Sequence, residues 1–178
     1  MKAIACTKYG PPDVLQLKEV EKPTPKEDEV RIKIYATTVS SGDVIDRTGT
    51  VSPWAWLPTR IKFGFRKPKR TIPGAELVGE NESVGKDVIL FRKGDQVFGN
   101  TGWCPPPFAE YVYVSEDFAE LKPANLTFEQ AAAVPETAFA ALHGLRDKGQ
   151  IQPGQKLLKF IDYSYTRSLK IIHIYKFL

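Results

Sequence analysis

The segment 71–99 constrains the fold of this chain more than any other part of the sequence. Its apolar residues alternate with small or charged ones, and glycine recurs at Gly74, Gly79, Gly85, Gly94 and Gly99. A period of two that is interrupted by glycine predicts short, twisted strands joined by tight turns. We expect one strand over 75–80 and another over 95–99. The segment therefore predicts a mainly β domain.

A carboxylate lies within the first of these two predicted strands. Glu76 stands between apolar neighbours in a strand that we expect to be central. Burying a carboxylate without a partner is costly, because the charge loses its hydration. We therefore expect Glu76 to be held by a hydrogen-bond donor, a basic neighbour or a metal. A structural role is favoured over a catalytic one.

Other segments extend the β pattern and add short helices. Further strands are predicted over 1–9, 14–20, 29–36, 108–114 and 156–161. Ser41 or Asp43 is expected to cap a short helical turn. Thr127 with Gln130 three residues later resembles a capping box, which marks the start of a helix. Another helix is predicted over 137–148.

Composition limits the class of protein. The 178 residues suit one domain, or one domain plus a fragment of a second, and 42% hydrophobic with 26% charged residues is typical of a globular chain. Cys6 and Cys104 are too few for a four-cysteine metal site and fit a reducing compartment, with one disulfide left open. No apolar run approaches the roughly 20 residues of a membrane helix, and no signal peptide is recognisable. We expect a cytoplasmic chain with no membrane partner.

Aromatic and basic residues are mixed in a long section, 50–70, which is predicted to be irregular. Six basic residues fall between Arg60 and Arg70. Such a mixture can clamp nucleic acid, but no nucleic-acid-binding motif accompanies it, so a lid packed by its aromatic side chains is favoured. The net charge of +4 comes from the residues after 155, which hold five basic residues and one acidic residue. We expect no nucleic-acid partner.

Several motifs occur in a familiar order along the chain. They are M-K-A-I-A-C-T-K-Y-G, P-G-A-E-L-V-G-E, V-G-K-D-V, G-D-Q-V-F-G and L-K-P-A-N-L-T-F-E-Q-A-A-A-V-P. From residue 1 to about 158 the chain resembles the medium-chain dehydrogenase/reductase superfamily, in its zinc-independent, quinone oxidoreductase-like branch of alcohol dehydrogenases. The resemblance implies a GroES-like, partly open β-barrel with a few short helices over 1–126. It also implies a helical connection and the start of an α/β Rossmann domain over 127–158, before an aberrant tail over 159–178.

The resemblance also predicts how the site differs from that of zinc-dependent relatives. Their catalytic zinc ligands correspond here to Ser40, Ala75 and Glu136. Serine and alanine are not zinc ligands of the usual thiolate, imidazole or carboxylate kind. The structural-zinc loop is also absent, since only Cys104 lies near that region. We expect no zinc.

Without a metal, hydrogen bonds and the cofactor must polarise the substrate. The resemblance implies Ser40 and Asp43 as catalytic residues, and Ser41 and Thr137 as cofactor-binding residues, with Thr137 replacing the threonine usual where Ala140 stands. Plain turn chemistry is an equal alternative for the serines and Asp43, because these residue types favour caps and turns. Tyr9, Trp54 and Trp103 are candidates for a pocket lining, with packing as the alternative.

The family resemblance implies an oxidoreductase in which NADPH or NADH reduces a quinone, enone or other carbonyl compound. No glycine follows Gly154, and no dinucleotide fingerprint is present. We therefore expect this chain to be a truncated, partial or inactive form that binds no nicotinamide cofactor tightly. The alternative is a non-enzymatic GroES-like binding module. A small-molecule carbonyl or quinone is the expected partner, and a homodimer is left open.

Overall fold

The computed structural model describes residues 1–50, 53–101 and 107–155. The chain divides into two compact units, Met1–Pro135 and Glu136–Leu178. The predicted strand over 156–161, the tail over 159–178, Trp103 and Cys104 lie outside the described residues. Within the described residues, no helix has both the length and the apolar character needed to cross a membrane.

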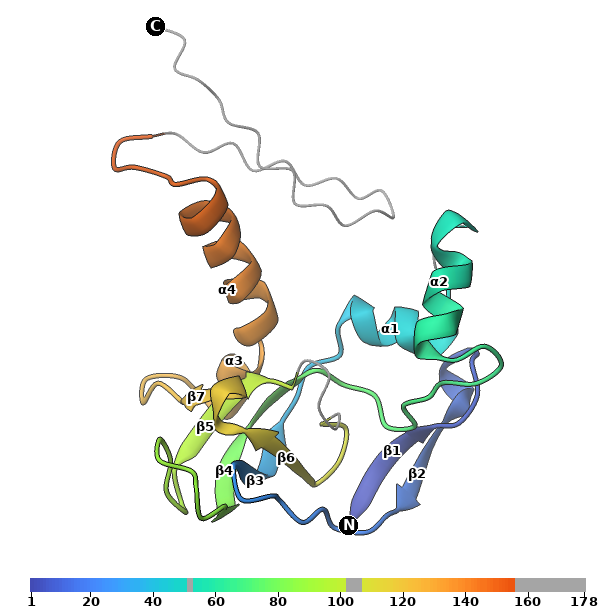
Figure 1. The fold of residues 1–178 in the computed structure, drawn as a ribbon, viewed down its shortest axis with the longest axis horizontal. Coiled ribbons are helices and arrows are strands. Elements are labelled where there is room, and N and C mark those ends of the chain that lie inside the picture. The colour runs from blue at the N-terminus through green and yellow to red at the C-terminus, as the bar shows by residue number, and fades with distance from the viewer. Residues whose placement is uncertain (51–52, 102–106, 156–178) are drawn as a thin grey trace, which may run out of the picture. The chain divides into compact units, whose positions relative to one another are not determined.

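The first unit is built on an antiparallel sheet of five strands in the order β6-β3-β4-β5-β7 (Figure 1). The strands are β3 (Glu29–Ala36), β4 (Glu76–Val84), β5 (Gln96–Asn100), β6 (Tyr111–Ser115) and β7 (Ala119–Leu121). A second antiparallel pair consists of β1 (Lys2–Cys6) and β2 (Leu15–Glu19). β1 bonds to the segment that leads into β6, where Ile4 N donates to Phe108 O at 2.8 Å. The predicted mainly β, partly open barrel is confirmed.

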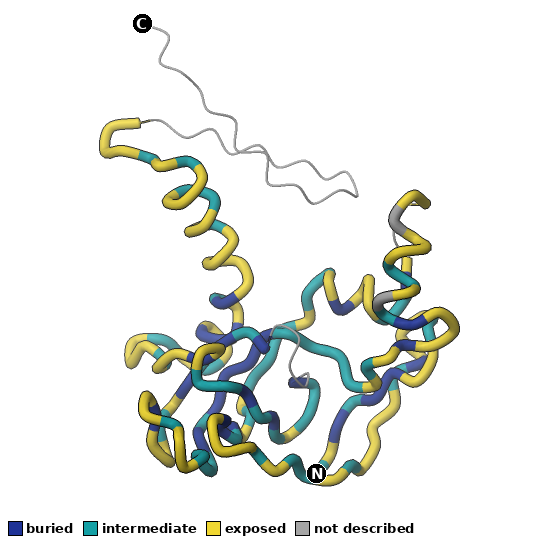
Figure 2. The backbone as a smooth tube through the Cα atoms, in the orientation of Figure 1, coloured by how far each residue is buried: buried dark blue, intermediate teal, exposed yellow. Residues whose placement is uncertain are grey.

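Alternation along the strands fills the core on both faces of the five-stranded sheet (Figure 2). One face buries a cluster formed by Val30, Ile32, Leu77, Phe91, Val97, Val112, Val114 and Ala119. On the other, Val78 contacts Ala131 and Ala132 of α3 (Phe128–Ala132). Leu77 and Val78 are adjacent in β4, so their side chains point to opposite faces. The predicted capping box is confirmed, because Gln130 N donates to Thr127 Oγ1 at 3.2 Å and Thr127 N donates to Gln130 Oε1 at 3.0 Å.

Two glycines of the opening motif allow close approach of neighbouring backbones. A Cβ on Gly79 would lie 2.0 Å from Lys33 O, and one on Gly99 would lie 2.1 Å from Phe118 O. No side chain fits at such distances, so glycine is required in both central strands. Some glycines of the segment 71–99 are therefore required by the close approach of neighbouring strands, and not only by turns.

The structure corrects the prediction for the section 50–70. An eleven-residue helix, α2 (Pro53–Phe63), occupies much of it, where an irregular segment was expected. Pro53 suits the first position of a helix, because its missing N–H would be unpaired there. Pro58 lies inside the helix and removes only one backbone hydrogen bond. The prolines favoured the prediction of an irregular segment. The structure accommodates both of them within a helix.

The second unit contains α4, which runs Pro135–Leu142 and whose first residue belongs to the first unit. A six-residue π-helical segment, His143–Lys148, follows it directly. The single helix predicted over 137–148 is therefore split into two forms. The helix that starts at the capping box, α3, ends at Ala132, before α4 begins at Pro135.

Candidate functional site

The start of helix α1 (Ser41–Thr48) brings three of the four predicted site residues together. Ser40 is the N-cap residue of this helix, and Asp43 takes part in the cap as the other member of a capping box. The expected cap at Asp43 is therefore confirmed in part, and the one at Ser41 is wrong. Ser40 N donates to Asp43 Oδ2 at 2.7 Å, and Asp43 N donates to Ser40 Oγ at 3.4 Å. This reciprocal pair satisfies backbone donors that the first helical turn would otherwise leave unpaired. Turn chemistry is therefore one role of Ser40 and Asp43.

Each member of this pair retains some capacity for chemistry. The Ser40 hydroxyl is used as an acceptor, and a hydroxyl in that role still has its own proton to donate. Asp43 is only 8% exposed, because its carboxylate turns back onto the backbone of Ser40. The arrangement fixes the position of Ser40 and keeps Asp43 away from bulk solvent.

Ser41 differs from its neighbours in having an unsatisfied hydroxyl. Its Oγ is buried and has no hydrogen-bond partner among the described residues. Leaving a buried polar group unpaired costs about 1–3 kcal/mol. Such a group marks a place that water or a ligand completes. Ser41 is therefore the residue of this turn that best fits a ligand contact.

Two threonines fix this turn to the central strand of the sheet. After β3 ends at Ala36, Thr37 Oγ1 donates to the main-chain oxygen of Glu76 at 2.6 Å. Thr38 Oγ1 donates to the Glu76 carboxylate. Glu76 is 4% exposed, so the prediction of a buried carboxylate with a partner is confirmed, and Thr38 is one such partner. These bonds hold the segment that leads into Ser40.

Apolar side chains surround the turn on its solvent side. Val39, Val44 and Ile45 are all exposed. A few polar groups set in an apolar surface are typical of sites for small molecules. The start of α1 therefore has the composition of one wall of such a site.

The fourth predicted site residue, Thr137, lies in α4 and belongs to the second unit. Its side chain is exposed, and its cofactor-binding role stays a prediction. Among the described residues, no group of three or more His, Cys, Asp and Glu side chains gathers in a way that could hold a metal ion. The expectation that zinc is absent also stays a prediction.

Sequence reasoning missed a cavity beside α1. Its volume is about 210 Å³, and it is lined by Cys6, Tyr9, Asp46, Arg47, Phe63, Pro68, Lys69, Arg70, Ile72, Pro73 and Gly74. Of the three candidate pocket residues, Tyr9 does line it. The lining comes from three segments far apart in the chain, so no local motif reveals it.

Two titratable groups of this cavity have shifted pKa values. Partial burial raises the pKa of the Asp46 carboxyl, the negative charge of Asp43 raises it further, and Arg70 opposes both. Burial also raises the pKa of the Cys6 thiol, against the opposing charge of Arg47. Cys6 is a free thiol whose Sγ lies 3.3 Å from the main-chain oxygen of Lys8. The thiol is therefore protonated and unreactive at neutral pH.

Comparison with known proteins identifies the family. Residues 26–124 match the family model described as the alcohol dehydrogenase GroES-like domain. The quinone oxidoreductase of Sus scrofa is 32% identical over 159 residues, which cover 89% of this chain and 44% of that protein. The chloroplastic NADPH-dependent alkenal/one oxidoreductase of Arabidopsis thaliana is 34% identical over 154 residues, which cover 82% of this chain and 37% of that protein.

A solved structure agrees with these matches. The quinone oxidoreductase from Coxiella burnetii superimposes with a TM-score of 0.73 at 30% identity, covering 87% of this chain and 47% of that one. The chain thus spans less than half the length of these relatives. The family model covers more than half of this chain, and the β architecture agrees with it. This chain therefore belongs to the alcohol dehydrogenase GroES-like domain family, in the quinone oxidoreductase-like branch of the medium-chain dehydrogenase/reductase superfamily.

Proposed function

We propose that this chain supplies the substrate-side half of a zinc-independent, NAD(P)H-dependent reductase of quinones, enones or related carbonyl compounds. The observation that carries the proposal is the buried Ser41 hydroxyl at the first turn of α1, which has no hydrogen-bond partner in the described part of the chain. The names of the Sus scrofa and Arabidopsis relatives support the reaction class. The cytoplasm is the proposed compartment, with a small molecule and no nucleic acid as the partner.

The start of α1 fits the nicotinamide end of such a cofactor. Ser41 offers an unpaired hydroxyl for a ribose hydroxyl or the carboxamide, while exposed Val39 and Val44 offer an apolar surface for the flat ring. When bound, the reduced nicotinamide supplies a hydride. Thr137 keeps its proposed role as a cofactor-binding residue.

Ser40 is proposed to act on the substrate. Its hydroxyl proton can be donated to the substrate oxygen, where negative charge grows during reduction, and a donor placed in advance stabilises that charge. Asp43 accepts the Ser40 N–H at 2.7 Å, so it orients Ser40. Within this scheme Asp43, predicted as catalytic, acts as a positioning residue.

These contacts predict weak cofactor binding by this chain. In dinucleotide-binding domains, much of the affinity comes from the pyrophosphate at a helix N-terminus after a glycine-rich turn. The 178 residues contain no such fingerprint. We propose that these 178 residues alone bind NAD(P)H weakly.

A chimera tests the proposal. Residues 1–155 would be joined to the dinucleotide-binding half of a quinone oxidoreductase, and NADPH oxidation followed with a quinone and an enone. We expect turnover, with Ser40→Ala lowering kcat by about 100-fold or more, as for loss of a charge-stabilising donor. Ser41→Ala should raise KM for NADPH with a smaller effect on kcat. Thr48→Val, a hydroxyl at the far end of α1, is the matched control and should be neutral.

The alternative is a non-enzymatic binding module, and the cavity beside α1 favours it, because that cavity is complete within the first unit. The same chimera separates the two functions. A folded chimera that is inactive with every quinone and enone, or in which Ser40→Ala matches the parent, contradicts the reductase. Retention of a small apolar ligand by that inactive chimera would support the binding module.

A further inference from the structure

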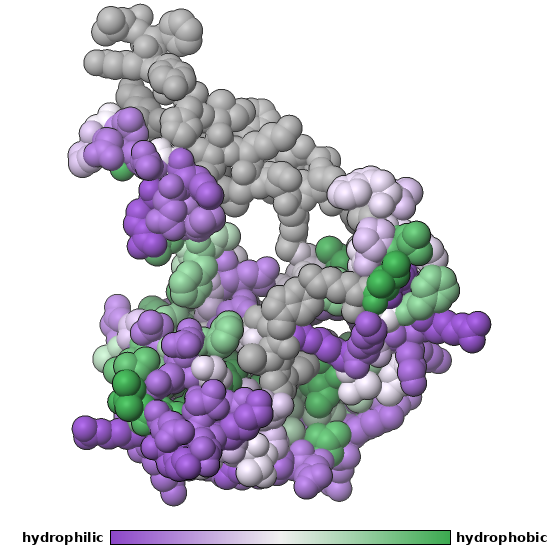
Figure 3. Space-filling model, viewed as in Figure 1, coloured by the Kyte–Doolittle hydropathy of each residue, from purple (hydrophilic) through white to green (hydrophobic). Residues whose placement is uncertain are grey.

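Helix α2 presents an apolar face to solvent. At about 100° per residue, Trp54, Leu57 and Ile61 project within a sector of about 60° on the helix. Their exposed fractions are 84%, 54% and 65%. Figure 3 shows green, hydrophobic residues beside paler ones over this helix. Exposed apolar patches of this kind on a soluble domain mark interaction sites.

The neighbouring face of α2 contacts the rest of the domain. The Arg60 guanidinium lies 3.9 Å from the centroid of the Tyr9 ring and 5.9 Å from that of Trp56. Tyr9 in turn donates its hydroxyl to Gly64 O at 2.8 Å. A Cβ on Gly49 would lie 2.7 Å from Arg60 Nη1, so glycine leaves room for the guanidinium. These contacts fix the orientation of α2 and leave the Trp54 face turned outward.

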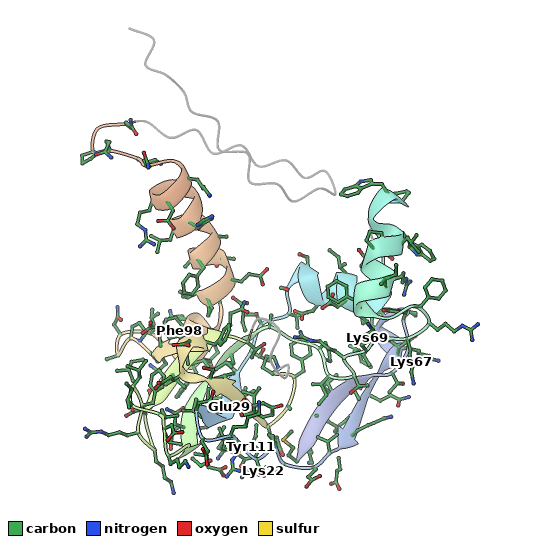
Figure 4. The ribbon with its side chains drawn as sticks, viewed as in Figure 1. Lys22, Glu29, Lys67, Lys69, Phe98 and Tyr111 are labelled. Carbon is green, nitrogen blue, oxygen red and sulfur yellow. The ribbon has the colours of Figure 1, made fainter. Side chains whose placement is uncertain are left out.

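Positive charge accompanies the apolar face. Between residues 47 and 75 the sequence has no acidic residue and seven basic ones, Arg47, Arg60, Lys62, Arg66, Lys67, Lys69 and Arg70. Arg66, Lys67 and Lys69 are exposed in the loop that follows α2. Lys67 and Lys69 lie beside the base of that helix in Figure 4. A cationic, apolar segment of the chain is complementary to an anionic surface that has an apolar layer beneath it.

We infer that α2 and the loop 64–70 dock on an anionic lipid surface. The exposed side chains of Trp54, Leu57 and Ile61 enter the boundary between headgroups and acyl chains. Arg66 and Lys67 pair with headgroup phosphates, each basic residue adding to the affinity. Tryptophan favours this interfacial depth because its ring is apolar and its N–H is polar.

The chemistry of the face distinguishes lipid from nucleic acid. The bases of nucleic acids stack on aromatic rings. The aliphatic side chains of Leu57 and Ile61 offer no such stacking, and their burial is favourable only through the hydrophobic effect. The eleven residues of α2 extend about 16 Å, far short of the roughly 30 Å hydrocarbon core. The helix therefore lies on the bilayer. The expectation of no membrane partner rested on the lack of a spanning segment, which interfacial docking does not need.

Vesicle binding by the full chain tests the inference. Vesicles of phosphatidylcholine with about 30% phosphatidylserine would be compared with phosphatidylcholine alone, because the attraction depends on anionic lipid. We expect co-sedimentation and a blue shift of tryptophan emission with the anionic vesicles only. Binding should be lost when salt shortens the Debye length from about 10 Å to about 3 Å.

Paired variants assign the binding to this surface. Arg66→Glu with Lys67→Glu should weaken binding by at least about 25-fold, from roughly fivefold per basic residue removed. Trp54→Ser with Ile61→Ser should weaken it at least about tenfold. Ile89→Ser, at a side chain 85% exposed far along the chain, is the apolar control. Lys93→Glu, in the turn before β5, is the charge control, and both controls should bind normally.

Four outcomes overturn the inference. They are equal binding to neutral vesicles, vesicle binding unchanged in both paired variants, and no vesicle binding at all. The fourth is binding of an oligonucleotide, or self-association seen by light scattering, in place of vesicle binding. All substituted side chains are exposed, and circular dichroism would establish that each variant is folded.

Discussion

Replacing Thr38 by valine tests how the site is anchored to the sheet. The Thr38 hydroxyl donates to the carboxylate of Glu76, which is 4% exposed in the central strand. Valine keeps the shape and the β-branch of threonine but removes this donor. The change therefore removes one charge-assisted hydrogen bond with little change in packing.

The expected cost follows from the type of acceptor. Hydrogen bonds to charged groups contribute about 1.5–3 kcal/mol, while those between neutral groups contribute about 1 kcal/mol. Thr38→Val should therefore lower the free energy of unfolding by about 1.5–3 kcal/mol. Thr37→Val is the matched control, because Thr37 donates to the neutral main-chain oxygen of Glu76 at 2.6 Å. It should cost about 1 kcal/mol.

Urea unfolding of the full chain at pH 7, followed by circular dichroism, measures both costs. The double variant Thr38→Val with Glu76→Gln completes a cycle, because the amide has no charge for Thr38 to stabilise. We expect the cost of Thr38→Val to fall to about 1 kcal/mol in the Glu76→Gln background. An unchanged cost in that background, or a cost of Thr38→Val no larger than that of Thr37→Val, would contradict a charge-assisted bond between Thr38 and Glu76.

Three further predictions concern titratable groups. Burial raises the pKa of Asp46 in the folded state, so its ionised form destabilises the fold; Asp46→Asn should raise Tm at pH 7, and this gain should shrink as the pH falls towards 4. A hydrogen bond from Lys22 at 2.6 Å, aided by Arg31, lowers the pKa of Glu82. The ionised Glu82 carboxylate stabilises the fold by up to about 1 kcal/mol, because the ion pair is partly open to solvent. This contribution should be complete above the ordinary glutamate pKa and should be lost as the pH falls through the lowered pKa. Glu82→Gln should therefore lower Tm at pH 7 but not at a pH below the lowered pKa. Cys6 is 3% exposed, and in a Cys104→Ser variant it should react with Ellman's reagent only after denaturant is added.

Local patterns predicted the framework of this protein well. The strand over 29–36 coincides with β3, and the strand predicted over 95–99 lies within one residue of β5. The buried, partnered Glu76 was also predicted, because a carboxylate in a central strand has few alternatives. The alternation of apolar and polar residues, and the cost of burying a charge, depend on only a few neighbouring residues. Both can therefore be recognised in the sequence alone.

Other features depend on contacts that a linear pattern does not contain. Helix α2 was not predicted because its segment contains two prolines. The helix is also stabilised by the stacking of Arg60 on Tyr9, which lies some 50 residues earlier in the chain. Ser40, Ser41 and Asp43 are all residue types that can cap a helix. Ser40 is the N-cap residue because the Asp43 carboxylate accepts a hydrogen bond from the Ser40 N–H. The unpaired state of the Ser41 hydroxyl is set by what surrounds it in space, so its residue type gave no sign of it.

Saturation-transfer NMR with NADPH and the full chain tests the central proposal most directly. If the start of α1 holds the nicotinamide end, protons of the nicotinamide ring should receive saturation from the protein while those of the adenine should not. Ser41→Ala should weaken that transfer, and Thr48→Val should leave it unchanged. Equal saturation of both rings, transfer to adenine alone, or nicotinamide transfer that survives Ser41→Ala would contradict the assignment of Ser41 and of this turn to the cofactor.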